Sequence, residues 1–188
     1  GIIAILDGQH LFTALQLLGL PIFYTNVGEK SKEEAVSLMA TLNSTASNWK
    51  LFDYCYAFAK LNNEDYRKVI YFFEKYNYGI SDIGAVLNCS TGHEVVTRLK
   101  RGDFTSQLSI DQAEVIFGYI ENILSVLPEV TRFQMSKVVR AFNRYYLFVE
   151  KYDHALIMKK VQQERETLRL FVEDKTFFEF FRDIKLKK

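Results

Sequence analysis

A polar cluster near the start of the chain carries the residue types best suited to hold an anion. Asp7-Gly8-Gln9-His10 follows an apolar run and precedes an amphipathic segment that closes at Gly19. A helix that starts there offers unpaired backbone N–H groups and the positive end of its dipole, which suit a phosphate or carboxylate ligand. We therefore predict a ligand-binding patch made of Asp7, Gly8, Gln9 and His10. The alternative is that Asp7 caps the helix and His10 is an ordinary surface residue.

The segment Ile80–Leu99 has the pattern of a helix–turn–helix, in which a second helix enters the major groove of DNA. Apolar residues at positions 83, 87, 95 or 96, and 99 would pack the two helices together, and Gly84 would let them approach closely. The residues predicted to face DNA are Ser90, Thr91, His93, Thr97 and Arg98, with Lys100 and Arg101 meeting phosphate. A pair of packed helices with no role in DNA binding is the alternative.

Basic residues also outnumber acidic ones between Glu129 and Arg165. Lys137, Arg140 and Arg144 follow one another at i, i+3 and i+7, so they line one face of a helix. Such a stripe can follow a phosphate backbone, and we predict that it contacts DNA. The alternative is a solvated surface with no partner.

The elements around these residues are expected to be a βαβ unit followed by helices. Strands are predicted near Ile2–Leu6 and Ile22–Asn26 with a helix between them, because this order with short connections requires a parallel crossover. From residue 31 the periodicity is helical, and Ser31 with Glu34 has the pattern of a capping box. Further helices are predicted over residues 49–61, 64–76, 81–87, 91–101, 110–127 and 131–152, with shorter runs to residue 186.

The predicted fold class is α+β and predominantly α-helical. It comprises a small N-terminal βαβ remnant, a helix–turn–helix-like region and a C-terminal helical bundle. Residues 103–109 are the best candidate for a seam, so the predicted domains are residues 1–102 and residues 103–188. Phenylalanines near the end of the chain are expected to dock onto the bundle or onto a partner chain.

The Asp7–His10 motif resembles the DGQHR signature of the ParB/sulfiredoxin superfamily, which includes ParB-type DNA partition proteins and related phage and mobile-element proteins. The resemblance implies a nucleotide or phosphate beside Gly8-Gln9-His10-Leu11, with Asn43 matching an asparagine that serves nucleotide chemistry. It also implies a helix–turn–helix after the N-terminal domain. Since strands normally precede this motif in the superfamily, we expect that domain to be incomplete here.

Three positions depart from the superfamily pattern. Leu11 and Ala46 stand where arginines are expected, and Leu42 replaces an acidic residue. Arginine grips phosphate bidentately, and an NTPase needs charge to hold metal and triphosphate. We therefore expect no nucleotide hydrolysis.

Composition narrows the function classes. A net charge of +1 leaves any nucleic-acid contact to local basic patches rather than to the chain as a whole. Cys55 and Cys89 are too few and too separated for a disulfide framework or a CxxC zinc site. No apolar run has membrane-spanning length. We expect a cytoplasmic protein with no metal site and no membrane partner.

Together these patterns predict a non-catalytic, ParB-like DNA-binding or DNA-associated protein from a phage, plasmid or mobile element, with a vestigial or ligand-binding phosphate site. An enzyme is the second reading: nucleotide hydrolysis, phosphotransfer or nuclease chemistry at the Asp7–His10 site. A structural interaction module is the third. A homo-oligomer is compatible with each reading.

Overall fold

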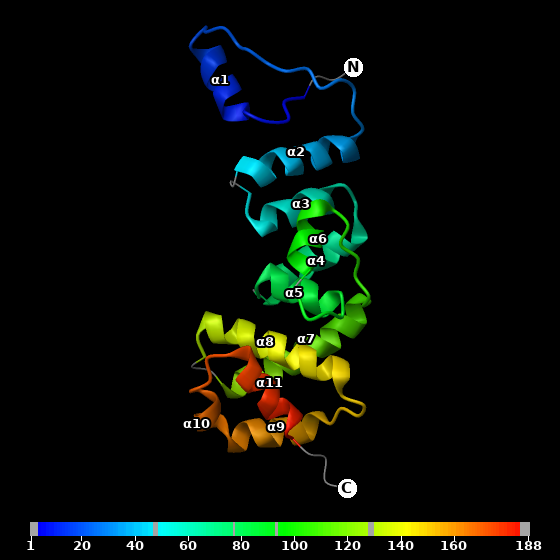
Figure 1. The fold of residues 1–188 in the computed structure, drawn as a ribbon, viewed down its shortest axis with the longest axis vertical. Helices are drawn as coiled ribbons and strands as arrows, with labels where there is room; N and C mark the ends of the chain where they lie inside the picture. The colour runs from blue at the N-terminus through cyan, green and yellow to red at the C-terminus, as the bar shows by residue number, and fades with distance from the viewer. Residues whose placement is uncertain (1–3, 47–48, 77, 93, 128–129, 185–188) are drawn as a thin grey trace.

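The computed structural model describes residues 4–46, 49–76, 78–92, 94–127 and 130–184, and over these ranges the chain is helical without a strand. The helices stack along one long axis, with α1 at one end and α9 and α10 near the other (Figure 1). In chain order they are α1 (Gln9–Leu17), α2 (Lys32–Ala46), α3 (Leu51–Lys60), α4 (Glu64–Tyr76), α5 (Ile80–Leu87), α6 (Val95–Arg101), α7 (Ile110–Val126), α8 (Arg132–Phe148), α9 (His154–Gln163), α10 (Arg165–Leu168) and α11 (Asp174–Arg182).

The predicted α+β class with its βαβ remnant is wrong. Residues 4–6 and Ile22–Asn26 form no strand, and residues 1–3 of the first predicted strand lie outside the described residues. α1 forms where a helix was expected, but it buries none of its residues. A pair of parallel strands needs packed layers on its faces, so an unburied helix cannot support a sheet here.

The helices from α2 to α6 form the first half of the stack. α3 packs against α4 and α6, and α2 lies over the α3–α6 end. The capping box is confirmed, because Ser31 Oγ accepts the Glu34 N–H at 3.1 Å and Glu34 Oε2 accepts the Ser31 N–H at 2.8 Å. α4 has the limits that its apolar spacing predicts.

The helices from α7 to α11 form the second half, with α8 at its centre. α8 packs against α11, α7 and α5, and α7 also packs against α9. The terminal phenylalanines dock as expected: Phe177 and Phe181 are buried, and the Phe181 ring lies 5.7 Å from that of Phe142. One contiguous cluster of buried side chains runs through both halves, crossing between them where Phe72 meets Phe117 at 4.8 Å.

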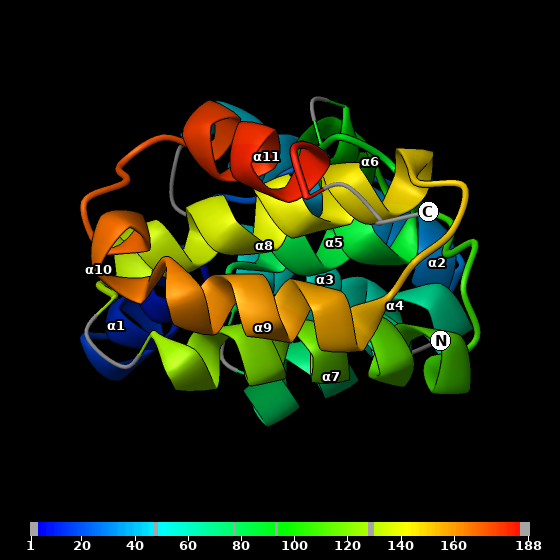
Figure 2. The same ribbon diagram turned by 90° about the horizontal axis from the view of Figure 1, so that it is seen from below.

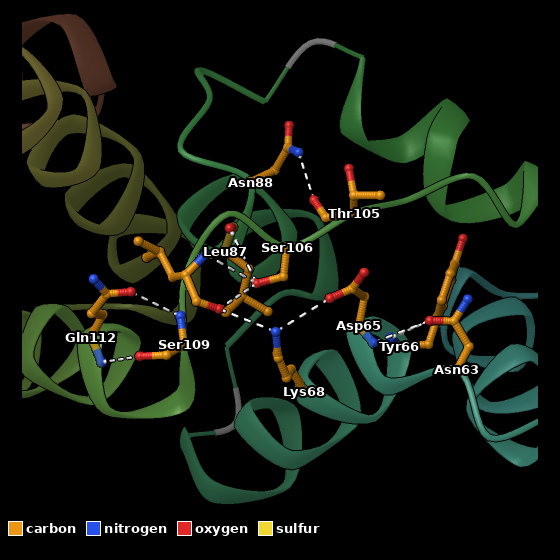
Figure 3. Close-up of polar contacts among 11 residues, drawn as sticks. Asn63, Asp65, Tyr66, Lys68, Leu87, Asn88, Thr105, Ser106, Ser109 and Gln112 are labelled. Carbon is orange, nitrogen blue, oxygen red and sulfur yellow. Dashed lines mark hydrogen bonds and ion pairs between the residues drawn. The ribbon is translucent and has the colours of Figure 1, made fainter.

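The segment between the halves, residues 103–109, is held in place by polar contacts (Figure 3). Asn88 Nδ2 donates to the Thr105 carbonyl at 2.7 Å, and Lys68 Nζ reaches the Leu108 carbonyl at 3.3 Å. A serine–glutamine capping box then starts α7. These contacts fix the orientation of α7 relative to α4 and α5, so the two halves are joined by an ordered connection.

Candidate nucleic-acid interface

α5 and α6 pack together through the residues expected of a helix–turn–helix. Ile83 and Leu87 on α5 are fully buried, as is Leu99 on α6, with Val95 nearly so. At Gly84, an added Cβ would lie 2.6 Å from Val95 Cγ1, so any larger residue would force its neighbours to shift. The predicted close approach at Gly84 is therefore confirmed.

The connection between the two helices is longer than predicted. α6 begins at Val95 rather than at Thr91, because Gly92 adopts a φ of 96° and Cys89 a φ of 50°, which are incompatible with a right-handed helix. His93, one of the residues predicted to face DNA, lies outside the described residues. The connection also exceeds the short turn of a typical helix–turn–helix.

Tyr66 on α4 holds the end of α6. Its buried hydroxyl lies 3.1 Å from the Arg98 carbonyl and 3.2 Å from that of Leu99, and it accepts the Phe104 N–H at 3.3 Å. Burial raises the pKa of Tyr66, so the hydroxyl stays protonated and can donate to these helix-end carbonyls. The end of α6 is thus held by a side chain of α4, and the opposite side of α6 remains on the surface.

That outer side presents cations. Thr97, Lys100 and Arg101 are exposed, and Arg98 is half-buried. Lys100 Nζ lies 5.8 Å from the centre of the Tyr54 ring. Among the residues that the structure describes, no ion pair involves Arg98, Lys100 or Arg101. Over the described residues, none of these three cations is therefore held in an ion pair.

Two neighbouring residues that were predicted to face DNA, one in the turn and one at the start of the second helix, differ from each other. Thr91 is exposed, as expected. Ser90 is turned inward: its Oγ is buried without a hydrogen-bond partner, and its carbonyl accepts from Asn143 Nδ2 of α8 at 2.9 Å. The prediction that Ser90 faces a groove is wrong, because the turn after α5 is fastened to α8.

The basic residues of the stripe predicted on α8 make contacts with other side chains of this chain. Arg140 Nε donates to Asp82 Oδ1 on α5 at 2.6 Å, and Ser136 Oγ donates to the other oxygen of that carboxylate at 2.6 Å. Lys137 is half-buried with Nζ 4.9 Å from the Phe133 ring centre, and the Arg144 guanidinium lies 4.3 Å from that of Phe178 on α11. Arg140 and Arg144 thus connect α8 to α5 and α11, whereas Lys137 contacts a ring of α8 itself.

Asp82 is the residue that sequence reasoning missed. It is 2% exposed and sits on a helix whose other residues are almost all buried. A buried carboxylate requires a cationic or hydrogen-bonding partner. The signal available in the sequence was an acidic residue inside an otherwise apolar helix, which could have indicated that one of the α8 cations has a structural partner.

The predicted ligand-binding patch lies at the start of α1, far from α6 along the stack (Figure 1). Asp7, Gly8, Gln9 and His10 are all exposed. Gly8, not Asp7, is the N-cap, and Asp7 Oδ1 instead accepts the adjacent Gly8 N–H at 2.7 Å. Asn43 lies on α2, but its side chain is outside what the structure describes. The geometry thus shows a helix start on the surface, and a ligand there stays a prediction.

Figure 2 shows α6 and α11 along one side of the stack and α7 along the other. Within the described ranges there is no group of three or more His, Cys, Asp or Glu residues placed to hold a metal ion. No described helix combines the length and apolar content needed to cross a bilayer.

Comparison of the chain with family models, with curated proteins and with solved structures found no match. The fold and the site therefore define the class by themselves: over its described residues, an all-helical stack with a short helix that presents exposed cations outside any ion pair.

Proposed function

We propose that this chain is a non-catalytic DNA-binding protein and that α6 is its main contact. The observation that carries the proposal is the arrangement of α6: Val95 and Leu99 are buried against Gly84, while Thr97, Lys100 and Arg101 are exposed. Lysine and arginine side chains on a rigid helix can meet phosphate oxygens and release counterions. The ParB-like resemblance of residues 7–10 is a second reason to expect DNA association, and it too is a prediction.

The division of labour on α6 follows from residue chemistry. Lys100 and Arg101 stand at the last turn and would meet the phosphate backbone, which positions the protein without reading sequence. Thr97 is one turn earlier and carries a short side chain that can touch a base edge. Arg140 is left out of the contact surface because its guanidinium is already paired with Asp82.

The test is the binding of a fluorescent duplex by the protein and by two double variants. Lys100→Gln/Arg101→Gln removes the α6 cations, and Lys151→Gln/Lys159→Gln removes two exposed cations from the region of α9 as a control of equal charge. We expect the α6 variant to lose affinity by roughly tenfold for each phosphate contact removed at moderate salt. The control should bind as the wild type does.

Thr97→Ala tests the reading of sequence. We expect it to alter the ranking of duplexes of different sequence while leaving the affinity for a random-sequence duplex near that of the wild type. A wild-type protein that binds no duplex, or an α6 double variant that binds as well as the wild type, would overturn the proposal.

A further inference from the structure

His154, the first residue of α9, lies where that helix meets α7. The two helices pack against each other, and α9 buries Ile157 and Val161 (Figure 2). The imidazole of His154 stacks on the ring of Tyr119 from α7, with the two ring centres 4.4 Å apart. The contact between these helices therefore includes a group that can change its charge near neutral pH.

Both ring nitrogens of His154 have hydrogen-bond partners. Nε2 lies 3.1 Å from Asn122 Nδ2 on α7, and Nδ1 lies 2.7 Å from the hydroxyl of Tyr152. An amide nitrogen only donates, so Nε2 must accept and the ring hydrogen must be on Nδ1, from where it is donated to the Tyr152 hydroxyl oxygen. This arrangement requires a neutral imidazole, because a protonated ring carries hydrogens on both nitrogens.

We propose that His154 is a proton-sensitive contact, which holds α9 against α7 while its imidazole is neutral and weakens when the imidazole is protonated. Protonation places a hydrogen on Nε2, so that two donors face each other and the hydrogen bond with Asn122 is lost. Since this contact is separate from α6, it does not depend on the proposed binding of DNA.

The groups around the ring favour its neutral form. The titratable side chains near His154 or its partner Tyr152 come from α7, from α8 and from the connection between α8 and α9, and they are Tyr119, Tyr145, Tyr146, Tyr152 and Asp153. Burial raises the pKa of the tyrosines at 145, 146 and 152, so these hydroxyls stay uncharged in the neutral range.

Asp153 is the charged member of this group, and its effect is opposed. Burial lowers the pKa of His154, whereas the Asp153 carboxylate acts in the other direction. That carboxylate also caps α9, accepting the Leu156 N–H at 3.0 Å. The positive end of the α9 dipole further disfavours a positive charge on the first residue of the helix. Acid is therefore needed to protonate the ring and weaken the contact.

The first test is the position of the ring hydrogen, read at neutral pH from the nitrogen chemical shifts of the His154 ring in the full chain. We expect the hydrogen on Nδ1, with the exposed His10 as the internal reference. A hydrogen on Nε2 would overturn the proposal, because protonation would then create no clash with the Asn122 amide. This measurement uses the wild type and does not depend on whether any variant folds.

The second test is amide hydrogen exchange in α9 from about pH 7.5 to about pH 5, corrected for the intrinsic rate. We expect protection in the wild type to fall roughly fivefold, the factor that the loss of one hydrogen bond gives. Asn122→Asp supplies a carboxylate that accepts from the protonated ring, so this variant should keep its protection in acid. The control Gln162→Glu adds the same charge at an exposed position of α9 and should stay as acid-sensitive as the wild type.

Two exchange results would also overturn the proposal. One is a wild type whose α9 protection is the same at both ends of this pH range. The other is an Asn122→Asp variant that loses protection in acid to the same extent as the wild type.

Discussion

Replacing Arg140 with alanine is expected to destabilise the fold, although the residue lies on the outer face of α8. The change removes the cation from Asp82, whose side chain is 3% exposed, and leaves Ser136 as its remaining side-chain partner. Losing one partner of a fully buried ion pair costs about 3–5 kcal/mol. Because the Arg140 side chain is 44% exposed, water can partly replace it, so we expect about 2 kcal/mol.

The assay is urea unfolding followed by circular dichroism, with the free energy of unfolding extrapolated to water. Arg144→Ala on the same face is the matched control, because it removes a contact with the Phe178 ring that is worth only about 0.5–1 kcal/mol. Asp82→Asn in the Arg140→Ala background should recover part of the loss, since it removes the unpaired charge. An Arg140→Ala protein within about 0.5 kcal/mol of the wild type would refute this reasoning.

Three further substitutions test other parts of the structure. Burial lowers the pKa of His154 below its ordinary value of 6.5, so the unfolded chain binds the proton more readily than the folded chain does. The free energy of unfolding should therefore fall as pH drops below that value, and His154→Gln should flatten the profile of melting temperature against pH. Gly84→Ala places a Cβ against Val95 and should lower the free energy of unfolding by about 1–2 kcal/mol despite alanine's higher helix propensity, a loss that urea unfolding will measure. Tyr66→Phe leaves the end of α6 without its hydroxyl partner and should cost about 1–3 kcal/mol, with faster amide exchange in α6; unchanged exchange there would contradict the anchoring role.

Much of the helical architecture could be predicted because its signals are local. The Ser31–Glu34 capping box and the limits of α4 depend on residues within one or two turns of each other. The packing of Gly84 against the following helix was also predictable, since its partners Val95 and Leu99 lie on the next helix along the chain. Such features require no knowledge of which distant segments meet.

The predictions that were wrong depended on contacts between segments that are distant in the sequence. Ile22–Asn26 has the composition of a strand, but a strand forms only where another strand supplies hydrogen bonds, and the described chain supplies none. Arg140 was expected to contact phosphate. Its actual partner, Asp82, is 58 residues away in the sequence, and a local pattern cannot reveal such a distant pair. Ser90 was expected to face DNA. Its carbonyl instead accepts a hydrogen bond from Asn143 on α8, a residue far from Ser90 in the sequence.

The most direct test of the central claim, that the cations of α6 contact DNA, is the salt dependence of duplex binding. The slope of log Kd against log salt concentration reports the number of phosphate contacts, at about 0.9 for each contact. We expect Lys100→Gln/Arg101→Gln to reduce the slope measured for the wild type by the contribution of about two phosphate contacts. Lys151→Gln/Lys159→Gln should leave the slope unchanged. Equal slopes for the wild type and the α6 variant would contradict the claim.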